Sequence, residues 1–146
     1  MERLSTLFNV TEFPFKLYDK DGNKTYHENS DGFWVRYEYD SNGNVTYHEN
    51  SNKYWCRREF DSNNNITYHE DSTGFWNRRE YDSNGNKTYH ENSNEYWYRR
   101  EFDSNNNQTY YEDSKGKIRD TKKQECPDTV LINGTVYKKQ TPDIST

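Results

Sequence analysis

The stretch that decides the fold is YDSNGNVTYHENSNKYWCRREFD, residues 39–61, because its end repeats its beginning. Tyr39-Asp40 returns 21 residues later as Phe60-Asp61, and SNGNVTYHE at 41 returns as SNNNITYHE at 62. Across residues 13–115 the same period brings back a Thr-Tyr pair, with its Tyr at 26, 47, 68, 89 and 110. Periods of about 20–50 residues are typical of architectures in which each unit packs on its neighbours.

Each unit of the repeat predicts two strands. FWVRYEYD (33–40) is rich in aromatic residues that favour strands, and VTYHEN (45–50) is the return strand. No apolar pattern with a helical period occurs between residues 13 and 115. We therefore predict an all-β fold. It is an antiparallel β-hairpin repeat ribbon of about ten short strands, in a single-layer sheet that is twisted or curled.

The segments between the strands carry turn chemistry. DSNGN (40–44) predicts a type I turn in which the side chain of Asp40 caps the turn and Gly43 takes a positive φ. Asn64 and Asn106 replace that glycine in alternate units, and Asn tolerates the same backbone region. A second turn is expected at NSDG (29–32) and its copies.

Alternation along the strands sorts the side chains onto two faces. In residues 33–40, Phe33, Val35, Tyr37 and Tyr39 fall on one face, and Trp34, Arg36, Glu38 and Asp40 fall on the other. If the bulged turn is correct, Tyr47 joins the Phe33 face and His48 joins the Trp34 face. A two-residue Asn-Gly turn would shift the pairing by one residue and exchange this second set.

The composition is that of an ordered chain with an unusual interior. Only 28% of the residues are hydrophobic and the mean hydropathy is −1.56, yet 17% are aromatic and recur at fixed places. Aromatic rings, which bury about 150–250 Å² each, must therefore replace an aliphatic core. The 25 acidic and 20 basic residues are interleaved, which argues against a nucleic-acid-binding footprint.

Other bulk features bound the location of the protein. No apolar run approaches the roughly 20 residues that span a bilayer, so no membrane association is expected. The beginning, MERLSTLFNV, lacks the apolar segment of a secretory signal. Two cysteines, Cys56 and Cys126, form no disulfide framework, which favours a reducing compartment. We expect a cytoplasmic protein.

The chain divides into four parts on this interpretation. Residues 1–12 are an apolar N-terminal cap segment, and 13–115 are the 21-residue hairpin repeats. Residues 116–128 form a polar linker, and 129–146 contain a C-terminal hairpin and tail. In that last part, Asn133-Gly134 is the expected turn of an aliphatic hairpin.

Residues 18–44, YDKDGNKTYHENSDGFWVRYEYDSNGN, carry a family resemblance. They contain a Tyr-Asp, a Gly three residues after that Asp, a mid-unit Asp-Gly, and then YEYD. This resembles the YD repeat of RHS-type proteins, whose hairpin arrays form shells around toxins or adhesion surfaces. The resemblance implies hairpin geometry for residues 13–120. It does not imply encapsulation, because about five units cannot enclose a cargo domain. MORN-type hairpin repeats are a weaker match, because their glycines are denser.

The repeat does not suggest catalysis or a cofactor. Catalysis needs different groups that converge on one point, whereas a ladder of identical units places like residues roughly 10 Å apart. The same spacing keeps His27, His48, His69 and His90 from sharing a zinc ion, whose ligands lie about 2.0–2.1 Å away. We expect no enzyme, no cofactor and no metal, and we expect these histidines to pack against Arg36 and its copies.

The Trp, Arg and Tyr side chains instead indicate a binding surface, because these types are enriched at interaction hot spots. The candidate binding residues are Trp34, Trp55, Trp76, Trp97, Arg36, Arg57, Arg78, Arg99, Arg58, Arg79, Arg100 and Tyr98. A structural role is the alternative, in which Trp covers its own sheet and Arg–Glu pairs join neighbouring strands.

We predict a non-enzymatic repeat protein that binds another macromolecule, most simply a protein. One specific hypothesis is a phage or mobile-element inhibitor of a host protein. The alternatives are a carbohydrate-binding module, since exposed rings stack on sugars, and a purely structural repeat. Nucleic acid is not expected, because binding to single strands requires a basic groove.

Overall fold

The structure is a computed structural model and describes residues 3–121, 129–132 and 135–138. A short helix, α1 (Leu4–Leu7), precedes the strands. The strands are β1 (Phe15–Tyr18), β2 (Lys24–Glu28), β3 (Trp34–Tyr39), β4 (Val45–Asn50), β5 (Trp55–Phe60), β6 (Ile66–Asp71), β7 (Trp76–Tyr81), β8 (Lys87–Asn92), β9 (Trp97–Phe102), β10 (Gln108–Asp113), β11 (Ile118–Asp120), β12 (Thr129–Ile132) and β13 (Thr135–Lys138).

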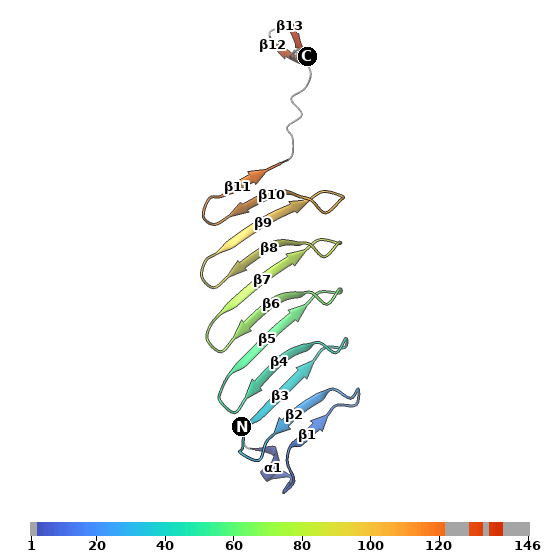
Figure 1. The fold of residues 1–146 in the computed structure, drawn as a ribbon, viewed down its shortest axis with the longest axis vertical. Coiled ribbons are helices and arrows are strands. Elements are labelled where there is room, and N and C mark those ends of the chain that lie inside the picture. The colour runs from blue at the N-terminus through green and yellow to red at the C-terminus, as the bar shows by residue number, and fades with distance from the viewer. Residues whose placement is uncertain (1–2, 122–128, 133–134, 139–146) are drawn as a thin grey trace, which may run out of the picture.

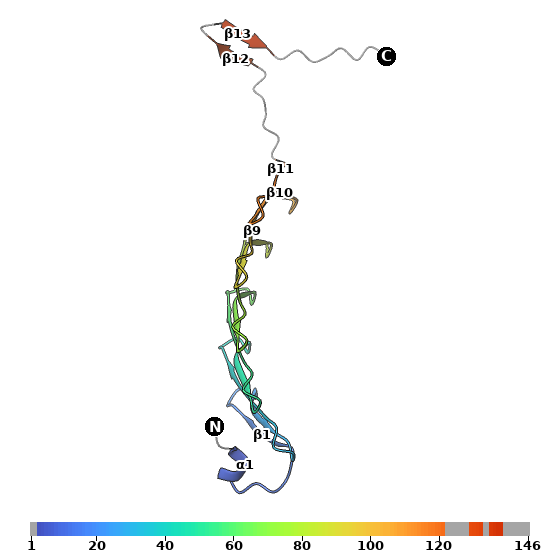
Figure 2. The same cartoon turned by 90° about the vertical axis from the view of Figure 1, so that its left-hand side faces the viewer.

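Eleven of these strands form one open antiparallel sheet in which sequence neighbours are also spatial neighbours, in the order β1 to β11. Figure 1 shows the strands stacked into a ribbon, with the two sets of turns along its opposite edges. Viewed from the side, the ribbon is a single layer (Figure 2). The predicted all-β hairpin ribbon is therefore confirmed.

Both sets of turns share one geometry, which follows from local chemistry. At the first set, the Gly43 N–H donates to the Asp40 carbonyl, and the Asp40 carboxylate accepts from the N–H groups of Asn42 and Asn44. Gly43 has φ +81° and its counterpart Asn64 has φ +62°, as predicted. An Asx-capped turn satisfies its own backbone donors, so it forms without help from distant residues.

The register within each hairpin differs from the prediction. A bulge leaves Thr46 without a partner, because Tyr39 lies opposite Val45 and Glu38 lies opposite Tyr47. His48 then lies opposite Tyr37. The prediction that Tyr47 joins the Phe33 face and His48 joins the Trp34 face was therefore wrong, because the structure places each on the opposite face. One extra residue at a bulge moves every later side chain to the opposite face.

The ends of the ribbon differ from its middle. At the N-terminal end, α1 lies on one side of the sheet (Figure 2). At the other end, Ile118–Asp120, which lies within the predicted polar linker 116–128, pairs with β10 as strand β11. The strands β12 and β13 form a separate two-stranded sheet, and the predicted Asn133-Gly134 turn lies outside the described residues. Within the described part of the chain, no helix has the length and apolarity to cross a membrane.

Candidate functional site

Opposed residues in an antiparallel sheet share a face, so the register defines two surfaces. We call one the Trp face; it carries Trp34, Arg36, Glu38, Tyr47, Glu49 and their copies at 21-residue intervals. We call the other the His face; it carries Val35, Tyr37, Tyr39, His48, Asn50 and their copies. No second sheet or helix layer covers either surface over β4 to β10 among the described residues (Figure 2).

The predicted binding residues are divided between these faces. All four Trp residues and the arginines 36, 57, 78 and 99 lie on the Trp face. Arg58, Arg79, Arg100 and Tyr98 lie on the His face, where Arg58 opposes His69 and Arg79 opposes His90. The expectation that the histidines pack against Arg36 was therefore wrong, and the bulge at Thr46 is the reason. The arginines next to the histidines are instead Arg58 and Arg79, each one position after an arginine of the Trp face.

On the Trp face, the return strands β2, β4, β8 and β10 carry a hydrogen-bonded Tyr-x-Glu pair. The Tyr47 hydroxyl donates to Glu49 at 3.0 Å, and the Tyr89 hydroxyl donates to Glu91 at 2.8 Å. An arginine on the preceding strand then approaches the same glutamate, as Arg36 does at 3.3 Å from Glu49. These half-exposed pairs are worth about 1 kcal/mol or less each. They hold the side chains in a regular order.

Three shallow hollows follow this order along the Trp face. They are lined by Tyr47, Tyr68 and Tyr89, respectively, and their volumes are about 540, 400 and 510 Å³. Arginine and glutamate residues from the flanking strands also line them, for example Arg78 and Glu80 together with Tyr89. Three units of the repeat therefore present a similar hollow, lined by an aromatic ring and by charged residues.

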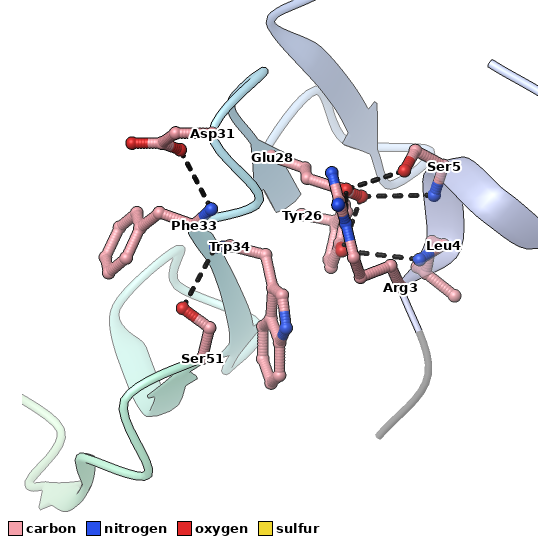
Figure 3. A network of polar contacts seen from close by, with 9 residues as sticks. All are labelled: Arg3, Leu4, Ser5, Tyr26, Glu28, Asp31, Phe33, Trp34 and Ser51. Carbon is pink, nitrogen blue, oxygen red and sulfur yellow. Dashed lines mark hydrogen bonds and ion pairs between the residues drawn. The ribbon is translucent and has the colours of Figure 1, made fainter. Parts of the chain in front are cut away.

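The first unit differs because α1 covers its Tyr-x-Glu pair. The Glu28 carboxylate accepts from the Ser5 hydroxyl at 2.6 Å, the Ser5 N–H at 3.1 Å and the Tyr26 hydroxyl at 2.9 Å. Arg3 forms an ion pair with the same group (Figure 3). Phe15 occupies the repeat position that holds arginine in later units, and it lies opposite Glu28. Arg3 therefore supplies the guanidinium that the first unit lacks.

This covering shifts two pKa values. Burial tends to raise the pKa of Glu28, but hydrogen bonds from Ser5 and Arg3 outweigh it and lower the pKa to about 2. Burial, followed by the contact with Glu28, raises the pKa of Tyr26 to about 12. Glu28 is 0% exposed, whereas the side chains of Glu49 and Glu91 are 25% and 31% exposed. The Tyr-x-Glu pairs of the interior units therefore remain partly exposed, whereas the pair of the first unit is buried.

The His face is built from rings and cations. His90 stacks on Tyr98 with 5.2 Å between ring centroids, and His48 contacts Tyr54 at 5.6 Å. The guanidinium of Arg100 lies 4.3 Å from the ring centroid of Tyr98. Cation–π contacts of this kind contribute about 0.5–2 kcal/mol. Rings on this face thus replace the missing aliphatic core, as the composition predicted.

One cluster on the His face has residue types that are used in nucleophilic catalysis. The Cys56 sulfur lies 3.5 Å from His69 Nδ1, and His69 Nε2 lies 3.7 Å from Asp71. Cys56 is only 1% exposed, however, and burial raises the pKa of its thiol. A reactive cysteine needs a lowered pKa and access to substrate. Among the described residues, no group of three or more His, Cys, Asp or Glu could hold a metal ion.

A solved structure contains a similar sheet. The crystal structure titled TcdB2-TccC3-TEV matches with a TM-score of 0.52 and 11% sequence identity, over 78% of this chain and 6% of that chain. That complex is an RHS/YD-repeat toxin protein, so the similarity fits a YD-repeat-like hairpin fold. No protein-family model matches the sequence. No curated protein matches it either. At this identity the likeness concerns the fold alone.

Two features of the site were missed by sequence reasoning. The placement of the histidines beside Arg58 and Arg79 depends on the register, for which the sequence allowed two solutions. The second is that Arg3 takes the place of the arginine that the first unit lacks. The sequence contains a sign of this, because Phe15 stands at the repeat position that is arginine at 36, 57, 78 and 99.

Proposed function

We propose that this chain acts by binding rather than by catalysis, and that the Trp face binds a protein partner in the cytosol. The observation that carries the proposal is the set of three hollows over Tyr47, Tyr68 and Tyr89. Tyr, Trp and Arg on a rigid framework are the residue types that dominate protein interfaces. The hollows repeat along a single layer, so several of them can contact one partner at once.

The test is a pull-down from cytosol of the source cell, followed by mass spectrometry and purification of the bound protein. We expect a stoichiometric complex that is lost in the double variant Trp55→Ala plus Trp76→Ala. Removing two such anchors from an interface costs about 2 kcal/mol or more each. The complex should remain in the matched variant His48→Ala plus His69→Ala, which alters the opposite face of neighbouring units.

A second pair of variants keeps the proposal testable if the Trp variant unfolds. Arg57→Glu plus Arg78→Glu reverses two exposed charges on the Trp face, and Arg58→Glu plus Arg79→Glu reverses two on the His face. Loss of the complex in the His-face variant but not in the Trp-face variant would place the interface on the His face and contradict the proposal. Retention of the parent chain on a polysaccharide column, with no protein bound, would favour the carbohydrate alternative instead.

A further inference from the structure

The fold separates charges that the sequence interleaves. On the Trp face each arginine has two glutamates nearby, as Arg36 does at 3.6 Å from Glu38 and 3.3 Å from Glu49. Arg57 and Arg78 likewise pair with glutamates. The His face has a different balance, because its unit carries an arginine, a histidine and aromatic rings but no glutamate. A chain with a net charge of −5 thus has one cationic surface.

The arginines of the His face are not neutralised within the described residues 3–121. Arg58, Arg79 and Arg100 form no ion pair with any carboxylate in that range. The Nε atoms of Arg79 and Arg100 are buried and lack a hydrogen-bond partner, as does that of Arg36 on the Trp face, so a ligand would meet the terminal nitrogens of the guanidinium groups. A guanidinium has five donors and no acceptor, so these side chains have unused capacity for an anionic ligand.

Two carboxylates do lie on this face, and both are already engaged. Asp71 accepts from the backbone and hydroxyl of Thr73, and Asp113 accepts from the N–H groups of Lys115 and Lys117. In the alternate units the same position is Asn50 or Asn92, which carries no charge. These acids therefore contact the turns and, on their own face, His69 and Tyr111, and they leave the arginine column unpaired.

Neighbouring groups respond to a positive potential on the His face. The pKa of Lys87 is lowered by burial and then by the charges of Arg79 and Arg100. The pKa of His48 is lowered by burial and then by Arg58 and His69. Like charges disfavour the protonated form of such groups. An anion on this surface would relieve the repulsion.

The rings provide the second half of a recognition surface. In three units the aromatic residue before the Trp contacts the histidine of the same face: Tyr54 with His48 at 5.6 Å, Phe75 with His69 at 6.1 Å and Tyr96 with His90 at 6.3 Å. Tyr54 remains 37% exposed. Proteins that bind single-stranded nucleic acid combine a positive track for the backbone with aromatic rings on which bases stack. The strand spacing repeats both elements about every 10 Å.

We propose that the His face binds a single-stranded nucleic acid, with Arg58, Arg79 and Arg100 contacting phosphates and the Tyr54 and Tyr96 rings stacking on bases. A duplex would offer the phosphates but not the base faces. An acidic peptide would offer carboxylates but would not use the rings. The surface is opposite the proposed protein-binding face, so either proposal can fail without the other.

The test measures binding of a fluorescein-labelled oligothymidylate by fluorescence anisotropy over a series of salt concentrations. The variant Arg58→Gln, Arg79→Gln, Arg100→Gln removes the proposed phosphate contacts. Each phosphate contact to a single strand contributes about 0.7 to the slope of log Kobs against log salt, so the slope should fall by about 2. The matched control is Arg57→Gln, Arg78→Gln, Arg99→Gln. It removes the same charge from the same strands on the other face and should keep the parent slope.

A second variant, Tyr54→Ala plus Tyr96→Ala, tests stacking. It should weaken affinity about 5- to 150-fold per lost stack without a change in the salt slope. Absence of binding by the parent chain at low salt would overturn the proposal, as would an equal loss in both arginine variants. Competition by polyglutamate as strong as by unlabelled oligonucleotide would assign the face to acidic peptides. Equal affinity for a duplex would exclude the stacking role. Circular dichroism of each variant checks that the sheet is retained.

Discussion

The first hairpin and the interior hairpins are built from the same repeat, yet within the described part of the chain only the first is covered on its Trp face. Tyr26 and Glu28 are buried beneath the segment that contains α1, and Trp34, which stacks on Tyr26, is buried as well (Figure 3). Their counterparts in the interior units remain half-exposed. The difference shows that the same Tyr-x-Glu pair can serve either as a buried structural contact or as part of an exposed surface. Where a segment covers it, it stabilises the end of the ribbon, and where nothing covers it, it forms binding surface.

The end of a repeat array is its weakest point, because a terminal unit has only one neighbour. The N-terminal segment compensates for this by supplying Arg3 and Ser5 to Glu28. Apart from Tyr54, the large apolar side chains that are exposed among the described residues lie at the two ends of the ribbon. Leu7, Phe8 and Tyr18 lie at one end and Ile118 lies at the other.

The largest effect is expected from Glu28→Ala. The substitution leaves the Ser5 N–H and hydroxyl, the Tyr26 hydroxyl and Arg3 without their shared acceptor. We expect a loss of about 2–3 kcal/mol in the free energy of unfolding, measured by urea denaturation. Glu70→Ala changes the same repeat position in an interior unit and should cost about 1 kcal/mol or less. Equal losses would mean that the covering segment contributes nothing.

The acid limb of the stability curve should show the same contrast. The pKa of Glu28 is lowered to about 2 from an ordinary value of 4.5, so the ionised form favours folding. Its contribution is complete above pH 4.5 and is lost as the pH falls towards 2. Urea midpoints of Glu28→Gln should therefore fall less steeply than those of the parent in this window.

The interior units should respond at higher pH through their histidines. The pKa values of His48 and His90 are lowered, chiefly by burial, so folding favours the neutral imidazoles. Their contribution is complete above the ordinary pKa of 6.5 and is lost as the pH falls below it. His48→Gln plus His90→Gln should flatten the curve between pH 6.5 and 5. A parent chain whose urea midpoint is constant over that range would contradict the burial of these rings.

The smallest effect concerns the turns that join successive hairpins. Gly32 and Gly74 take positive φ there, and Lys53 and Glu95 take the same conformation in alternate units with φ 65° and 61°. Side chains make this region unfavourable by about 1 kcal/mol. Lys53→Gly and Glu95→Gly should therefore each raise the free energy of unfolding by about 0.5–1 kcal/mol. Gly74→Lys is the reverse control and should lower it.

Much of the fold was predictable because its information is local. The turn at 40–44 forms from bonds between the Asp40 side chain and N–H groups two and four residues away. Gly43, Asn64 and their copies then mark the position within this turn that has positive φ. The candidate Trp and Arg residues were also placed correctly on one surface as far as residues 34, 36 and their copies are concerned. What failed was the pairing across the turn, because VTYHEN alternates equally well in either register.

The sequence by itself determined the period, the meander of hairpins and the use of rings in place of an aliphatic interior, since each follows from residues close together in the chain. Only the tertiary structure decided which side chains share a surface. One unpaired residue, Thr46 or its copy, moves the histidines away from Arg36 and next to Arg58. Only the tertiary structure also brought Arg3 to Glu28, because a contact across 25 residues depends on how the segment returns to the sheet. Both decisions are non-local: the register places Glu49 and its copies on the face of Arg36, and the return of the N-terminal segment covers the first unit.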